Sequence, residues 1–572
     1  MGTGSWKFSE LKFPKPNLKV FQDLYADAIE RVESATSGDD VMEIIFEVNE
    51  LSRRTTDLLT VAFIHHTMDV TDEAYAENHR WVEENRQYFV KAAIDFREAL
   101  YNSPYKEYIE ERIGPMYFTK MDIDKKTFSE ENVQLRQREA ELGDEYQRII
   151  ASCNIDFLGE PRSFIKLQDY FFDQDREVRR AAFREFSKFL AQHEKRLEEI
   201  WNDLIDIRNQ IGRNLGFDNY IPVGYLERGR LDYGQEEVAK FRKQVEDEIV
   251  PLCSKLYEAQ RKRLGVDELM VYDEKIVFPE GNARPIGDED YLMEEIVNML
   301  HDMSPETQEF IDFIMEHELI DYEDRPNRAG IEYSTMITSR KAPFVFSHFS
   351  ATAAGVSGII GAIGHAFAAY RAARMQILEE YYSSSSDIME IHSLSMSQFA
   401  NRYADSFFGD DAKRYEFFNL QDLMTFIPFG AAVDEFQHIC YSNQNLTPEE
   451  RNSEWRKLEE KYMPWRKYDD DDDFMNRGGY WYHKIHFFLY PLYYIEYCLA
   501  TVNAMEMNRK YVTHPARAWK EFLAITDIGG SKSYLDILKL ANLTPAYEDG
   551  AVEKSISYVK DVLEEYIENH EA

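Results

Sequence analysis

The sequence predicts a mostly α-helical protein with one small antiparallel sheet. Apolar residues recur at helical spacing through residues 17–150, and residues 130–270 continue as charged helix. The period-two alternation that marks a strand is confined to short runs near 330–337 and 344–346. With 572 residues, the chain is long enough for two or more lobes around a substantial core.

The composition is that of a globular protein with a large acidic excess. Hydrophobic residues make up 44% of the chain, charged residues 30%, and the net charge is −39. This charge repels phosphate backbones and anionic membrane surfaces, so we expect neither nucleic acid nor a membrane as partner. The four cysteines are far apart, without a C-x-x-C pair, and the N-terminus has no apolar leader. These features predict a cytoplasmic protein with reduced thiols.

The first helices are separated by turn signals. Leu18, Phe21, Leu24, Tyr25 and Ala28 recur at spacings of three and four, and the pattern stops at Ser37-Gly38-Asp39-Asp40. A second helix is predicted from about residue 41 to residue 68, where Asp69-Val70-Thr71-Asp72 forms a cap-like turn. From residue 404 onward, helices again alternate with short turns.

A helix of unusual composition is predicted over residues 350–380. Gly355, Gly358, Gly361 and Gly364 fall at every third position, and alanines occupy much of the remainder. Each interior glycine costs roughly 0.5–1 kcal/mol relative to alanine. Such a helix must be held in place by its neighbours.

The middle of this helix carries half of a metal-binding motif. In H-E-x-x-H, two histidines on one helix face bind a zinc ion, and the glutamate is the general base for the zinc-bound water. The corresponding residues here are Gly361-Ala362-Ile363-Gly364-His365. The second histidine is present as His365, whereas Gly361 replaces the first histidine and Ala362 replaces the base.

The residues around this motif resemble the oligoendopeptidase F family of zinc metallopeptidases, whose motif reads H-E-x-G-H-A-F. The resemblance rests on Gly364-His365-Ala366-Phe367 and on a downstream E-x-H-S-x-S-M segment that begins at Glu390. Further matching segments are Lys341–Ser347, Val433–His438, Arg477–Trp481, Pro491–Tyr497 and Gly529–Ser533.

The resemblance implies a two-lobed fold with a deep internal cleft, and a small sheet beside the central helix whose edge strand pairs with a bound peptide. It places an N-terminal helical lobe at 1–190 and a catalytic-type lobe at 191–572. The second lobe contains the degenerate zinc helix (350–380) and the helix of Glu390, which is the third zinc ligand in the family. The implied substrates are short peptides. From the residues alone, the edge strand is equally well explained as a structural hairpin.

The resemblance also assigns a substrate-binding role to the segment that follows Arg477-Gly478-Gly479-Tyr480. By position, His486, Tyr493 and Tyr494 are the residues that bind the substrate carbonyl and stabilise the oxyanion, and Tyr497 lies beside them. Imidazole and phenol groups supply the donors that this role requires. Aromatic packing in a helical core explains any one of these tyrosines equally well.

The remaining residues are not expected to support the family mechanism. A catalytic zinc ion needs three protein ligands and an open position, and only His365 and Glu390 remain. We therefore expect no zinc at high occupancy. His392 diverges from Glu390 on the helix and fits a supporting role, and His348 is either structural or a replacement ligand. Ala362 cannot accept a proton, so hydrolysis is predicted to be absent or residual.

Three functions stay open. The chain is a peptide-binding pseudopeptidase, a scaffold re-purposed (naturally or by engineering) for a small apolar ligand, or an active zinc peptidase with a rearranged ligand set. Gly and Ala in place of polar groups open an apolar volume of the kind that small-molecule pockets need. The predicted pocket residues are Gly358, Gly361, Ala362, His365, Glu390, His486, Tyr493, Tyr494 and Tyr497.

Overall fold

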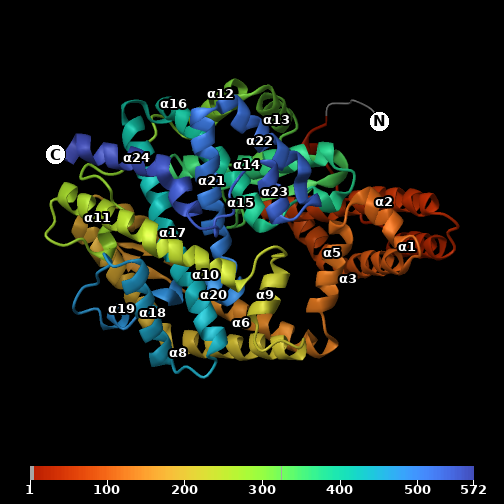
Figure 1. Cartoon of the computed structure of the whole chain (residues 1–572), viewed down its shortest axis with the longest axis horizontal. Coiled ribbons are helices and arrows are strands. Elements are labelled where there is room, and N and C mark those ends of the chain that lie inside the picture. Colours follow the sequence, from red (N-terminus) through yellow and green to blue (C-terminus); the bar gives the residue numbers. More distant parts are fainter. Residues whose placement is uncertain (1–5, 324, 572) are drawn as a thin grey trace. The chain divides into compact units, whose positions relative to one another are not determined.

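The computed structural model describes residues 6–323 and 325–571, and it is dominated by helices (Figure 1). The predicted lack of a leader peptide concerns a segment whose first five residues lie outside the described ones. The contacts divide the chain into two compact units of three segments each. Unit 1 comprises 1–122, 285–407 and 513–542, and unit 2 comprises 123–284, 408–512 and 543–572.

This division differs from the predicted boundary at residue 190, which falls inside the continuous helix α8 (Arg176–Asn214). The other helices that lie mainly in unit 2 are α6 (Val133–Ala151), α7 (Phe164–Gln168), α9 (Ile221–Glu227), α10 (Gln235–Gln244), α11 (Val250–Leu264), α17 (Ala412–Ser442), α18 (Pro448–Tyr462), α19 (Asp473–Asn476), α20 (Ile485–Leu489), α21 (Ile495–Thr513) and α24 (Ala551–Glu571). A hairpin of β1 (Ile155–Phe157) and β2 (Glu160–Arg162) also belongs to unit 2.

Unit 1 begins with a helical bundle. In its first helix the predicted apolar residues Phe21, Tyr25 and Ala28 are buried, whereas Leu24, which was also predicted on this face, is 48% exposed. Asn17 caps the first helix with its side chain, and Ser37 caps the second. The helices of this unit are α1 (Leu18–Glu33), α2 (Gly38–Met68), α3 (Glu73–Asn102), α4 (Lys106–Ile113), α5 (Met116–Thr127), α12 (Glu289–Met303), α13 (Pro305–Glu316), α14 (Ala353–Met375), α15 (Ser386–Phe399), α16 (Ala404–Phe408), α22 (Pro515–Ile528) and α23 (Tyr534–Leu540), with α5 and α16 ending just past its segment boundaries.

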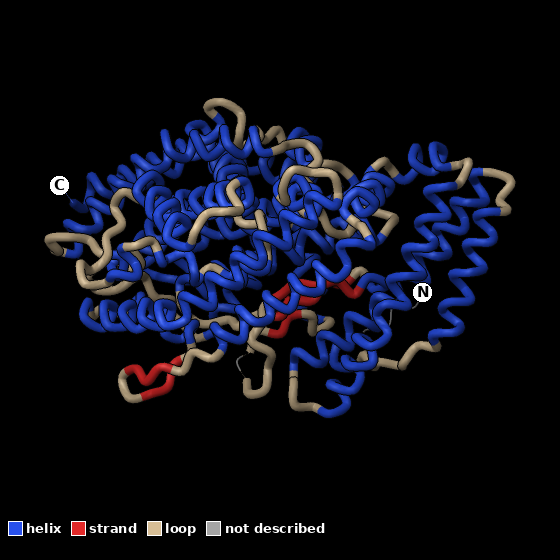
Figure 2. The backbone as a smooth tube through the Cα atoms, turned by 90° about the horizontal axis from the view of Figure 1, so that it is seen from below, coloured by secondary structure: helices blue, strands red, loops and turns tan. Residues whose placement is uncertain are grey.

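The small sheet of unit 1 confirms the predicted antiparallel pair and adds a third strand (Figure 2). β4 (Tyr333–Ile337) pairs antiparallel with β5 (Ala342–Phe346). β3 (Ile320–Asp321) pairs parallel with the other side of β5. The strand order β3-β5-β4 leaves β4 at an edge, and β5 is buried along its whole length.

The central helix α14 is the core helix of unit 1. Among the described residues, it alone is long and apolar enough to span a membrane, but 61% of its most apolar window is buried within the structure. It packs against α15, α22 and β5, and the ring of Phe367 stacks on Phe522 of α22. Burial against these neighbours offsets the helix cost of its glycines, as the sequence predicted.

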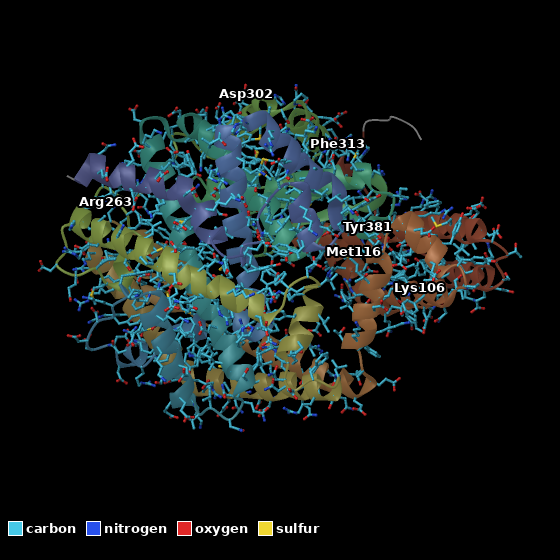
Figure 3. The ribbon with its side chains drawn as sticks, in the orientation of Figure 1. Lys106, Met116, Arg263, Asp302, Phe313 and Tyr381 are labelled. Atoms are coloured by element: carbon cyan, nitrogen blue, oxygen red, sulfur yellow. The ribbon has the colours of Figure 1, made fainter. Side chains whose placement is uncertain are left out.

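A short helical turn at Glu379–Tyr381 ties this core to the N-terminal bundle. The Tyr381 hydroxyl donates to the carbonyl of Ile113 at 2.8 Å, and its ring packs in the cluster that includes Met116 (Figure 3). Beside it, the Glu379 carboxylate accepts a hydrogen bond from Ser52 with one oxygen, while its buried Oε2 has no partner among the described residues. Burial raises the pKa of Glu379 to about 7.

Replacing Glu379 by glutamine is expected to stabilise the protein at pH 8. Because the folded-state pKa lies above the unfolded value of about 4.3, stability is fully present below that pH and is lost as the pH rises towards 7. The variant's advantage in free energy of unfolding should be roughly 1–3 kcal/mol at pH 8 and should shrink towards pH 5. Urea unfolding at both pH values measures it, and an advantage that does not change with pH would contradict the assignment.

Candidate functional site

The helix that carries the degenerate motif begins at a side-chain cap. The Thr352 hydroxyl accepts a hydrogen bond from the backbone N–H of Gly355 at 3.0 Å, which fixes the first turn of α14. Thirteen residues later, His365 lies at the centre of the helix. His365 faces Glu390 of α15 (Ser386–Phe399).

Two of the glycines are required by the close approach of α15. A Cβ atom on Gly364 would lie 2.8 Å from the Cβ of Met396 and 3.2 Å from the carbonyl oxygen of His392. A Cβ on Gly361 would lie 2.8 Å from the Ser393 hydroxyl. Gly358, one turn earlier, faces open space. Gly361 and Gly364 therefore allow α14 and α15 to approach each other, whereas Gly358 has no part in that contact.

The hydroxyls of α15 occupy the region where a histidine at position 361 would begin. Besides Ser393, the hydroxyl of Ser397 lies 3.3 Å from the Cβ position of Gly361, and it donates to the carbonyl of Ser357 at 3.2 Å. These serines were not predicted as part of the site. They follow Glu390 at i+3 and i+7, so the helical phase of α15 could have identified them.

The structure brings His365 and Glu390 together, as predicted. The Nε2 atom of His365 lies 3.8 Å from Oε2 of Glu390, and their side chains are 28% and 16% exposed. Burial lowers the pKa of His365 to about 4, so its imidazole is neutral at pH 7. A neutral imidazole is the form that binds a metal ion.

The neighbouring histidines do not complete a ligand set. His392 is buried on α15, and burial, with a further contribution from His365, lowers its pKa to about 3. His365 and His392 line one cavity of about 30 Å³, which has room only for a water-sized ligand. The Nε2 atom of His348 is already hydrogen-bonded to the Ala329 carbonyl at 2.8 Å, as expected of a structural histidine.

Zinc does not fit the side chains that are present. Within residues 6–323 and 325–571, no group of three or more His, Cys, Asp or Glu side chains is arranged to hold a metal ion. Position 361 offers no ligand atom, and Ala362 presents a methyl group in the place of the base. A catalytic zinc site needs three protein ligands, and this site supplies two.

The residues predicted to bind a substrate carbonyl gather in unit 2. The ring of His486, on α20, lies 4.7 Å from Tyr494 at a near-perpendicular angle. Tyr497, on α21, lies 5.0 Å from Tyr493 and 5.6 Å from Tyr494. The sequence prediction of one cluster agrees with this geometry, although several of the contacts are packing contacts between rings.

The electrostatics of this cluster favour neutral groups. Burial, together with the positive charges of Lys484 and Arg228, lowers the pKa of His486 to about 3. Burial also raises the pKa of the Tyr494 hydroxyl. The Nδ1 atom of His486 is buried and has no hydrogen-bond partner among the described residues. A neutral imidazole beside phenols can therefore donate to, or accept from, a polar ligand atom.

The comparisons with known proteins agree with this picture of the fold. Residues 8–128 match the peptidase M3 N-terminal domain, and residues 171–555 match peptidase family M3. The chain belongs to peptidase family M3. No curated protein matches it closely enough to count as a relative.

Among solved structures, this M3 family member is similar to a protein assigned as oligoendopeptidase F, with 36% identity, a TM-score of 0.89 and 99% of both chains covered. It is equally similar to PZ peptidase A in a structure with an inhibitor (36% identity, TM-score 0.89, 98% of this chain and 99% of the other). A Bacillus anthracis protein assigned as oligoendopeptidase F follows at 32% identity and TM-score 0.84, over 100% and 99% of the two chains. The predicted oligoendopeptidase F-like helical fold is thereby confirmed.

Proposed function

We propose that this M3 family member binds short peptides and does not hydrolyse them by zinc-activated water. The observation that carries the proposal is the pair Gly361 and Ala362, which removes one metal ligand and the general base together. His365 and Glu390 remain close to each other, but two ligands hold zinc far more weakly than three. Loss of the base alone costs roughly 100- to 10,000-fold in rate.

The edge strand β4 supports peptide binding. The N–H of Val345 donates to Leu319 on the β3 side, so the alternate residues Phe344 and Phe346 turn their backbone groups towards β4. Their partners in β4 are Thr335 and Tyr333, and the backbone groups of Ser334 and Met336 therefore point away from the sheet. These groups have no hydrogen bond to the described residues and can pair with an extended peptide.

The net charge supports binding of cationic peptides, and the cysteines support a cytoplasmic location. A net charge of −39 favours cationic peptides and disfavours nucleic acid and anionic membranes. The four cysteines are free and buried, which is consistent with a cytoplasmic protein. Within unit 2, the His486 imidazole and the Tyr493 and Tyr494 hydroxyls are suited to donate to a carbonyl group.

A small apolar ligand is the second candidate, because one observation favours it. A Cβ at Gly358 would meet nothing within 4 Å, and Ala362, four residues later, adds only a methyl group. The surface of α14 at Gly358 therefore offers open space beside small side chains. A natural loss of the motif and an engineered one would leave the same face.

An active enzyme with a rearranged zinc site is the third candidate, and the hydrogen bond that engages His348 argues against it.

The test combines binding and cleavage on the same samples. A fluorescent cationic peptide of about eight residues should show saturable anisotropy with the purified chain, and mass spectrometry should find it intact after incubation with added zinc. Replacing Met336 by proline removes the outward N–H without breaking the ladder to β5, and it should weaken binding roughly tenfold. Met336→Leu, which keeps the N–H, is the matched control.

Two results would overturn the proposal. One is cleavage of the peptide that zinc supports and a chelator abolishes. The other is binding that Met336→Pro and Met336→Leu leave equally strong, with both variants folded by circular dichroism. Binding of a compact apolar dye, with no response to peptides, would favour the second candidate.

A further inference from the structure

A lysine with unusual surroundings lies beside the aromatic cluster of unit 2. Lys484 follows a helical turn at Gly479–His483 and directly precedes α20. Its side chain is half-buried, and its Nζ atom lies 4.5 Å from the ring centroid of Tyr494 and 5.3 Å from that of Phe429. The amine therefore has two aromatic rings as close neighbours.

Lys484 differs from the nearby lysines because no carboxylate among the described residues pairs with it. Lys461 lies 2.9 Å from Glu435, and Lys467 lies 2.7 Å from Glu268. The charged residue that acts on Lys484 is another cation, Lys275, which itself pairs with Asp422 at 2.9 Å. A partly buried ammonium group with a cationic neighbour and no paired carboxylate is destabilised in its charged form.

The titratable groups around Lys484 leave the amine as the reactive atom. Burial lowers the pKa of Lys484 to about 8, and the charge of Lys275 contributes in the same direction. Burial and the charge of Lys484 lower the pKa values of His483 and His486 to about 3, so both rings are neutral. Burial raises the hydroxyl pKa values of Tyr480 and Tyr494. A substantial fraction of the amine is then neutral near physiological pH.

We propose that Lys484 is a reactive amine that forms an imine with an aldehyde or ketone whose apolar body packs on Tyr494 and Phe429. The rings supply an apolar wall, and the missing carboxylate leaves the nitrogen lone pair available. In the reaction, the nitrogen adds to the carbonyl carbon and forms the C–N bond. The two amine protons leave with the carbonyl oxygen as water, and the product is a C=N bond. No oxidant or reductant takes part.

Reductive trapping tests the proposal on the full chain. Benzaldehyde is the probe, and cyanoborohydride converts each imine into a stable secondary amine that peptide mapping by mass spectrometry locates. At pH 7.5, Lys484 should be labelled roughly tenfold faster than Lys461 and Lys467, because a carboxylate engages each of those two amines and none within the described part of the chain engages Lys484. Exposure alone predicts the opposite order for Lys467, which is 51% exposed, whereas Lys484 is half-buried.

Two variants make the result specific. Lys484→Arg keeps the charge and should lose the fast adduct while the slower labelling elsewhere continues. Lys275→Gln removes the neighbouring cation, so it should move the pH midpoint of Lys484 labelling upward and slow the reaction at pH 7.5. Labelling of Lys484 no faster than that of Lys467, or a pH midpoint that Lys275→Gln leaves unchanged, would overturn the proposal. Circular dichroism on both variants confirms that they are folded.

Discussion

Replacing Gly361 by histidine together with Ala362 by glutamate is expected to give a protein that binds about one zinc ion and cleaves short peptides at least roughly 100-fold faster. The new histidine would lie four residues before His365, on the same helix face, and Glu390 is already within 3.8 Å of His365. The three ligands and the base of the family pattern would then be present. Zinc per chain, measured after removal of excess metal, and hydrolysis of a fluorogenic peptide test the two parts separately.

The position of α15 decides how easily this restoration succeeds. The Cβ of the new histidine would begin 2.8 Å from the Ser393 hydroxyl, which must rotate away. A matched control is Gly358→His with Ala362→Glu, because position 358 is open but lies two turns from His365. The control should bind no zinc. Equal zinc contents in the control and the restored variant would contradict the assignment of position 361 as the missing ligand.

Replacing Gly364 by leucine is expected to destabilise the protein by roughly 3 kcal/mol or more. Its Cβ would lie 2.8 Å from Met396 and 3.2 Å from the backbone oxygen of His392, so α14 and α15 would have to move apart. Gly358→Ala is the contrasting change in the same helix. Because its Cβ meets open space, it should gain roughly 0.5–1 kcal/mol of helix propensity.

If the packing is as described, the two variants change the midpoints of thermal and urea unfolding in opposite directions. The midpoint should fall for Gly364→Leu and rise slightly for Gly358→Ala. A similar loss in both variants would mean that the whole glycine repeat, and not the face turned to α15, is packed. A Gly364→Leu protein as stable as the parent would contradict the close approach of the helices.

The sequence was sufficient to predict the frame of the site. The helical pattern predicted α14, and the resemblance named His365 and Glu390 as residual ligands, which the structure places 3.8 Å apart. The sequence could not distinguish Gly358 from Gly361 and Gly364. A glycine at every third position gives the spacing along the helix, but it does not identify the residues that each glycine contacts. That distinction depends on Ser393 and Met396, which belong to another helix.

Long-range contacts account for the other differences. β3 has only two residues, and it forms because β5 offers backbone donors to it from more than twenty residues away. Because two residues are too few to show the alternation of apolar and polar side chains, β3 could not be predicted as a strand. The units differ from the predicted lobes for a similar reason, since 513–542 joins unit 1 through contacts of α22 with α14 that no local pattern reveals.

The order of the segments also affects how the protein is made. About 140 residues separate the end of α14 from the start of α22, which covers it. At a synthesis rate of roughly 5–20 residues per second, α14 leaves the ribosome roughly 7–30 s before that cover exists. Throughout this interval the side of α14 that α22 covers is exposed to the cell, while β5 and α15 are available to pack on its other sides. Production of the folded protein should therefore depend on chaperones that shield α14 until translation reaches α22.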